Sequence, residues 1–134
     1  MKLYHNPRCS KSRTALLLLQ QRQVLVDVRL YLTEGIDADE VVELTKKLGL
    51  HPSEFVRKNE PEYKALGTDE FSIEEWADII ERYPILLQRP IAVTDDRARI
   101  CYKAIGFWLI AVRAFDAIDL FVANFAALAF KNGN

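Results

Sequence analysis

The sequence predicts an α/β protein in which helices flank a mixed β-sheet. In the first third of the chain, a short apolar stretch, a helix-forming segment and an alternating segment follow one another. They form a strand–helix–strand unit whose helix is long enough for a right-handed parallel crossover. The middle of the chain is helical, and two apolar stretches around an Asp-rich turn then predict a hairpin.

The first strand is expected over residues 2–5, because Asn6-Pro7 follows and proline cannot continue a ladder of backbone hydrogen bonds. A helix is predicted over Ser10–Gln21, with Ser10 as its N-cap. Apolar residues then alternate, at first with charged ones, which predicts a second strand with one buried face. The alternating apolar positions are Val26, Val28, Leu30 and Leu32.

A helical insertion is predicted over about residues 36–83. One helix spans Asp37–Leu48 and stops at Gly49, and a second begins at residues 51–54 and runs into 55–58. A third spans Ser72–Arg82, where Ser72 and Glu75 have the spacing of a capping box. The hairpin follows, with strands over 91–93 and 98–102 joined by a turn at 94–96.

The chain has 134 residues, which predicts a single domain over 1–134. Its net charge is −1 and it contains no Lys/Arg run, so nucleic-acid binding is not expected. The two cysteines lie far apart and no signal-like apolar run opens the chain, which predicts a cytoplasmic protein in a reducing compartment. Two histidines cannot form a zinc site with Cys9 at plausible spacing, so no metal is predicted.

An unusually apolar segment covers about residues 104–130. It is long enough to span a bilayer, but Arg113, Asp116 and Asp119 fall near its centre, where each costs about 2.5–3.5 kcal/mol. We therefore predict no membrane span. We hypothesise a homodimer contact through its aromatic and aliphatic side chains Phe121, Phe125, Leu128 and Phe130.

Cys9 is the residue that points most directly to chemistry. It lies where the first strand gives way to the first helix, and there the backbone N–H groups and the helix dipole lower a thiol pKa. Positive charge from Arg8, Lys11 and Arg13 acts in the same direction, and the Ser12 hydroxyl and His5 are close enough to hydrogen-bond the thiol or its network. The alternative is a small buried hydrophobe; the polar neighbours argue against it for Cys9, whereas Cys101 fits a core strand residue.

Residues 5–13, His-Asn-Pro-Arg-Cys-Ser-Lys-Ser-Arg, are similar to the active-site signature of the glutaredoxin-linked arsenate reductase family. The similarity continues through residues 55–60, 62–67 and 84–91, and covers roughly residues 2–101. The resemblance implies a thioredoxin-like mixed sheet with the helical insertion between the strand–helix–strand unit and the C-terminal hairpin. It also implies a cis-proline at Pro90, with a structural role.

The same resemblance implies roles for individual residues. Cys9 is the nucleophile that attacks arsenate, and His5 and Ser12 tune its thiolate. Arg57 and Arg89 match two oxyanion-binding arginines, and a planar guanidinium suits an oxyanion well. Taken without the resemblance, Arg57 fits an exposed helix arginine. No cofactor is bound: glutathione acts as co-substrate, and glutaredoxin reduces the mixed disulfide.

The sequence departs from the family at Tyr102, which stands where a third oxyanion arginine is expected. Lys103, Arg99 or Arg97 could replace it, and Lys11 and Arg13 are further candidates for the site. The substrate is thus arsenate, a related oxyanion or an oxidised thiol. Two alternatives remain. One is a Spx-like transcription regulator that binds RNA polymerase; Ser12, in place of a second cysteine, argues against disulfide sensing by such a protein. The other is an orphan thiol-exchange protein without arsenate activity.

Overall fold

The computed structural model describes residues 1–21 and 23–101. Within these residues, four strands form one mixed sheet in the order β2-β1-β3-β4. β1 (Lys2–Tyr4) pairs parallel with β2 (Asp27–Arg29) and antiparallel with β3 (Ile91–Val93), which pairs antiparallel with β4 (Ala98–Ile100). The predicted α/β class, parallel crossover and C-terminal hairpin are therefore confirmed.

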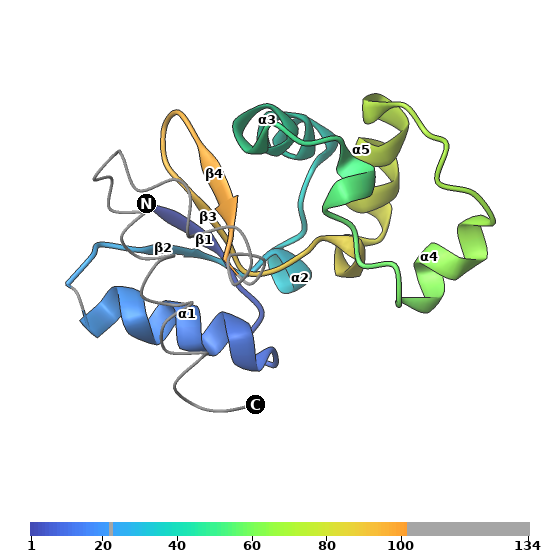
Figure 1. Ribbon diagram of the computed structural model, residues 1–134. Helices are drawn as coiled ribbons and strands as arrows, with labels where there is room; N and C mark the ends of the chain where they lie inside the picture. Colours follow the sequence, from blue (N-terminus) through green and yellow to red (C-terminus); the bar gives the residue numbers. More distant parts are fainter. Residues whose placement is uncertain (22, 102–134) are drawn as a thin grey trace, which may run out of the picture.

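Helix α1 (Ser10–Gln21) makes the crossover and covers one face of the sheet (Figure 1). Its bounds agree with the prediction, but Ser10 lies inside the helix and is not its N-cap. The carbonyl of Cys9 accepts the hydrogen bond from Arg13 N–H at 3.0 Å, so Cys9 holds the capping position. The core under the helix is formed by Leu3, Ala15, Leu18, Leu19, Ala92 and Cys101.

The other face of the sheet is covered by the helical insertion (Figure 1). Its helices are α2 (Tyr31–Glu34), α3 (Ala38–Leu48), α4 (Pro61–Leu66) and α5 (Ile73–Arg82), with 3₁₀ turns η1 (Pro52–Glu54) and η2 (Pro84–Leu86). Its core consists of large side chains with no exposed surface, including Tyr31, Val41, Phe55, Trp76, Ile80 and Leu87. This layer places residues 55–60 and 84–90 beside the start of α1.

The two long insertion helices have the ends that the sequence predicts. Asp37 accepts a hydrogen bond from Glu40 N–H at 2.8 Å at the start of α3, and Gly49 ends that helix with φ of 65°. Helix α5 begins with the predicted capping box between Ser72 and Glu75. Each cap satisfies backbone groups that a helix end leaves unpaired.

Two predicted elements are wrong. The second strand ends at Arg29 because its partner β1 ends at Tyr4, so the apolar residues beyond have no ladder to join, and Tyr31 begins α2. The helix predicted through residues 55–58 stops after the η1 turn. There, Arg57 N–H donates to the Leu86 carbonyl and Gln88 N–H to the Phe55 carbonyl, so the backbone pairs with the η2 segment instead of with itself.

Tyr102 and the apolar segment over 104–130 lie outside the described residues. The predicted dimer contact and the extent of the domain therefore stay predictions. Among the helices that the structure describes, none is long and apolar enough to cross a membrane.

Candidate active site

A short hydrogen-bonded turn that follows β1 holds Cys9 at the N-terminal end of α1. Cys9 N–H donates to the Asn6 carbonyl at 3.0 Å, and Arg8 N–H donates to Asn6 Oδ1 at 3.0 Å. The side chain of Asn6 thus closes the loop on itself, a frequent role for asparagine in turns. The loop presents a partly exposed thiol at the strand–helix junction predicted from the sequence.

The surroundings of Cys9 favour its thiolate. Burial raises the pKa of the Cys9 thiol, but the backbone N–H groups of Ser12 and Lys11 and the Arg89 guanidinium lower the pKa by more, so the net shift is downward. Donors and positive charge stabilise the anionic form of a thiol in this way. Cys9 therefore has the character of a nucleophile.

His5 and Ser12 form a buried pair beneath the loop. Ser12 Oγ lies 2.9 Å from His5 Nδ1 and accepts a hydrogen bond from Asn6 N–H at 3.0 Å. Burial lowers the pKa of His5, which keeps the imidazole neutral at physiological pH. The serine hydroxyl is thus engaged by His5 and the loop, and the group of Ser12 that acts on the Cys9 sulfur is its backbone N–H, not the hydroxyl expected from the sequence.

A cavity of about 260 Å³ opens beside Cys9, smaller than the ~300–1,000 Å³ usual for an organic ligand. Three segments line it: the start of α1, the 55–60 loop and the segment that follows η2. The β-bridge between Val56 and Leu87 joins the last two. Four lining residues are cationic and none is acidic, which suits a small anion; the full set is Cys9, Lys11, Arg57, Lys58, Asn59, Gln88 and Arg89.

Arg89 is the most deeply buried of these cations, with 8% of its surface exposed. One terminal nitrogen donates to the Ile85 carbonyl at 3.4 Å, but the Nε atom has no hydrogen-bond partner among the described residues. A buried charged donor without a partner is costly, so the fold keeps Arg89 in this place at the expense of an unsatisfied donor. The Arg89–Pro90 peptide bond that follows is cis, as the resemblance implies.

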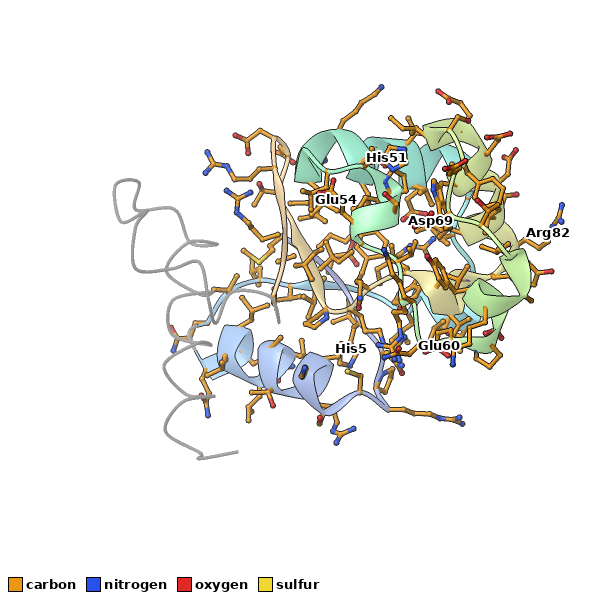
Figure 2. All side chains as sticks on the ribbon, turned by 45° about the vertical axis from the view of Figure 1, so that its right-hand side comes forward. His5, His51, Glu54, Glu60, Asp69 and Arg82 are labelled. Atoms are coloured by element: carbon orange, nitrogen blue, oxygen red, sulfur yellow. The ribbon has the colours of Figure 1, made fainter. Side chains whose placement is uncertain are left out.

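Arg57 also faces the cavity, and it does not lie on a helix. Its Nε atom donates to Glu60 Oε1 at 2.8 Å, and Figure 2 shows Glu60 in the loop across from His5. The Nε contact fixes one edge of the guanidinium while the side chain lines the cavity, 31% exposed. The alternative of an exposed helix arginine is therefore wrong.

Several other residues singled out from the sequence are placed elsewhere. Arg13 donates to the Pro7 carbonyl at 3.0 Å and Arg99 to the Ala98 carbonyl at 3.3 Å, and neither lines the cavity. Tyr102 lies outside the described residues. Cys101 is fully buried as expected, and burial raises the pKa of its thiol to about 12, so it is inert as a nucleophile.

The part of the chain that the structure describes contains no group of three His, Cys, Asp or Glu side chains able to hold a metal ion. The two histidines lie well apart in Figure 2: His5 is beside the start of α1, and His51 lies between α3 and η1. The prediction of no metal stays a prediction for the whole chain.

Four residues near the site were not predicted. Lys58, Asn59 and Gln88 line the cavity, and their position in the matching segments 55–60 and 84–91 was the available signal. Tyr31 was not found because the alternating pattern assigned it to a strand. The structure instead places it, fully buried, at the first position of α2.

The model of the ArsC family matches residues 4–106 of this chain. The chain belongs to the ArsC family. Among its relatives, an uncharacterised Escherichia coli K12 protein, YfgD, is 43% identical over 103 residues, covering 75% of this chain and 87% of the relative. An arsenate reductase from Neisseria meningitidis serogroup A is 38% identical over 103 residues, covering 75% and 88%.

The fold of this ArsC-family chain is similar to solved structures. An arsenate reductase from Vibrio cholerae matches with a TM-score of 0.69 at 34% identity, covering 75% of this chain and 89% of that one. The predicted thioredoxin-like arrangement with its helical insertion is thus confirmed, and the matched region contains every cavity residue named above.

Proposed function

We propose that this ArsC-family protein is an arsenate reductase in which Cys9 is the nucleophile. One observation carries the proposal: a thiol with a lowered pKa opens on a small cavity lined by four cations and no acidic residue. The names of the Neisseria and Vibrio relatives support arsenate as the anion.

The reaction needs two thiols. The Cys9 sulfur attacks arsenic(V), and one oxygen leaves as water, which gives a sulfur–arsenic bond. A second thiol then attacks the Cys9 sulfur, so that a disulfide forms and the electron pair of the broken sulfur–arsenic bond reduces arsenic(V) to arsenic(III). Overall, one arsenic acid and two thiols give one arsenous acid, one disulfide and one water.

The cavity overcomes the main obstacle to the first step. Arsenate and a thiolate are both anions and repel one another, so their approach requires positive charge at the place where they meet. Arg89 acts on the sulfur and lines the cavity, while Arg57, Lys58 and Lys11 supply further positive charge. Such preorganised donors stabilise developing charge in a transition state.

The second thiol comes from outside the described chain in this proposal. Cys101 is fully buried under α1 and does not line the cavity, and Ser12 occupies the position of a second cysteine in a Cys-x-x-Cys motif. We assign this role to glutathione, and the reduction of the resulting mixed disulfide to glutaredoxin. Such chemistry belongs in a reducing compartment such as the cytoplasm.

A coupled assay tests the proposal. Arsenate-dependent NADPH consumption is followed with glutathione, glutathione reductase and glutaredoxin for the full chain, Cys9→Ser and Cys101→Ala. We expect turnover by the wild type and by Cys101→Ala, and loss of turnover in Cys9→Ser. Turnover that persists in Cys9→Ser, or a wild type that does not respond to arsenate, would contradict the proposal. Omitting glutaredoxin or glutathione in turn tests each reductant.

A further inference from the structure

Tyr31 brings a buried hydroxyl close to the backbone that leads into Arg89. Its side chain has no exposed surface and belongs to the core on the insertion side of the sheet, together with Val56 and Leu87. The hydroxyl lies 3.5 Å from the Leu87 carbonyl oxygen, two residues before Arg89. Tyr31 is not among the residues that line the cavity, so its effect on an anion there is indirect.

Arg89 binds the same stretch of backbone as Tyr31, because its terminal nitrogen donates to the Ile85 carbonyl at 3.4 Å. Of the charged groups around Tyr31, the Arg89 guanidinium acts most strongly on the hydroxyl and lowers its pKa. Arg89 is thus anchored on the Ile85 carbonyl and acts on both the Tyr31 hydroxyl and the Cys9 sulfur. A long, flexible arginine side chain loses less conformational freedom on binding when it is already fixed in this way.

Tyr31 can play this part because it stays neutral. Burial raises the pKa of Tyr31 to about 12, against the opposing influence of Arg89 and Arg57. A neutral phenol has both a proton to donate, here toward the Leu87 carbonyl, and lone pairs that attract the Arg89 guanidinium. A phenylalanine would fill the same space and provide neither.

We propose that Tyr31 is a positioning residue, whose hydroxyl orients the Arg89 guanidinium toward Cys9 and the anion in the cavity. The part of this inference that concerns turnover rests on the proposed function. The part that concerns Cys9 ionisation does not, because it follows from the contacts among Tyr31, Arg89 and Cys9 alone.

The test compares Tyr31→Phe with a matched control, Tyr4→Phe. Tyr4 is also a buried tyrosine, its ring centre is 6.2 Å from that of Tyr31, and its hydroxyl donates to Glu40, whereas that of Tyr31 donates to the Leu87 carbonyl. The rate of Cys9 alkylation by iodoacetamide is measured against pH, with mass spectrometry to separate Cys9 from Cys101. Circular dichroism and thermal melting verify that both variants fold.

We expect Tyr31→Phe to move the Cys9 profile to higher pH and to weaken arsenate protection of Cys9 roughly three- to tenfold, the factor of a single hydrogen bond. Tyr4→Phe should leave both unchanged. Identical profiles in the two variants, whether shifted or not, would overturn the proposal. In the Arg89→Gln variant, adding Tyr31→Phe should not shift the pH profile of Cys9 alkylation any further. A full additional shift in this double variant would also overturn the proposal.

If Tyr31→Phe does not fold, Arg89→Lys provides the second measurement. Arg89→Lys keeps the charge but loses the fork that contacts both Tyr31 and Cys9, and it should also shift the Cys9 profile upward. An unchanged profile in Arg89→Lys would mean that orientation of the guanidinium is unimportant, which would overturn the proposal. Absence of arsenate turnover in the wild type would refute the proposed function without altering these alkylation results.

Discussion

At the scale of single residues, the ionisation of Cys9 is a balance between burial and donors. Removal from water opposes the thiolate, and two backbone N–H groups and Arg89 outweigh that effect. The backbone donors belong to residues 11 and 12, so they come with the helix start itself. Arg89 comes from the far end of the described chain, and it links thiol chemistry to anion binding.

Arg89→Gln should remove this link. We expect the pKa of Cys9 to rise, because one of the groups that stabilise its thiolate is lost, and arsenate kcat/KM to fall by about ten- to a hundredfold, the value of ~1.5–3 kcal/mol for a charged hydrogen-bond partner. Ultraviolet thiolate absorbance against pH and the coupled assay measure the two effects.

Arg99→Gln is the matched control for this substitution. Arg99 is exposed on β4 and does not line the cavity, so its removal should leave the titration of Cys9 as it is in the wild type. Equal effects of the two arginine variants would show that general positive charge, and not the contact of Arg89 with the sulfur, controls the thiol.

The sequence was sufficient to find site residues that are neighbours along the chain. Cys9, His5 and Ser12 lie on one loop and helix start, where local geometry and spacing already bring them together. Arg57 and Arg89 came from the family resemblance, since no local pattern separates them from surface arginines. Tyr31 could not be found, because its role depends on contacts with residues more than fifty positions away.

At the scale of elements, a charged network joins the sheet to α3. Arg29 on β2 binds Glu40 through two nitrogens, each at 3.1 Å, and Glu40 also accepts the Tyr4 hydroxyl hydrogen bond at 2.5 Å. Arg29 contacts Glu34 and the Gly35 carbonyl as well. The contacts of Arg29 with Glu34 and Gly35 fix the end of the short α2 segment that carries Tyr31.

Glu40→Gln should therefore destabilise the fold in a pH-dependent manner. Burial raises the pKa of Glu40, but the contacts with Arg29 and Tyr4 lower that pKa by a larger amount. The pKa of Glu40 in the folded protein therefore lies below its value in the unfolded chain. The stabilisation is then complete above the unfolded value of about 4.3 and is lost as pH falls through the folded pKa. We expect a loss of about 1.5–3 kcal/mol near neutral pH that shrinks in acid.

Urea unfolding at several pH values measures this difference, with Glu43→Gln as control. Glu43 forms an exposed i,i+4 pair with Lys47, which should contribute less than about 0.5 kcal/mol. A Glu40→Gln deficit that is constant with pH would mean that the carboxylate charge does not stabilise the network.

Elements with their own start and stop signals were predictable. Helices α3 and α5 have side-chain caps within the segment, so local sequence determines where they begin. The 55–58 segment was mispredicted because its backbone pairs with residues 86–88, a contact that local pattern does not contain. That non-local pairing is what builds the wall of the cavity.

At the scale of the whole molecule, charge is distributed very unevenly. The net charge of −1 gives no sign of an anion site, yet the cavity lining has four cations and no acid. Two of them are balanced just outside the cavity, Arg57 by Glu60 and Lys58 by Asp69. The fold brings three distant segments together and so concentrates positive charge at the cavity. The net charge of the whole chain does not reveal this concentration.

The most direct test of the central claim is arsenate protection of Cys9. The full chain is alkylated with iodoacetamide in increasing arsenate, with chloride at matched ionic strength as reference, and Cys9 labelling is followed by mass spectrometry. An anion cavity at the thiol predicts a saturable slowing of labelling that chloride does not reproduce and that Arg89→Gln weakens. Labelling that is unaffected by arsenate, or slowed equally by chloride, would contradict an oxyanion site at Cys9.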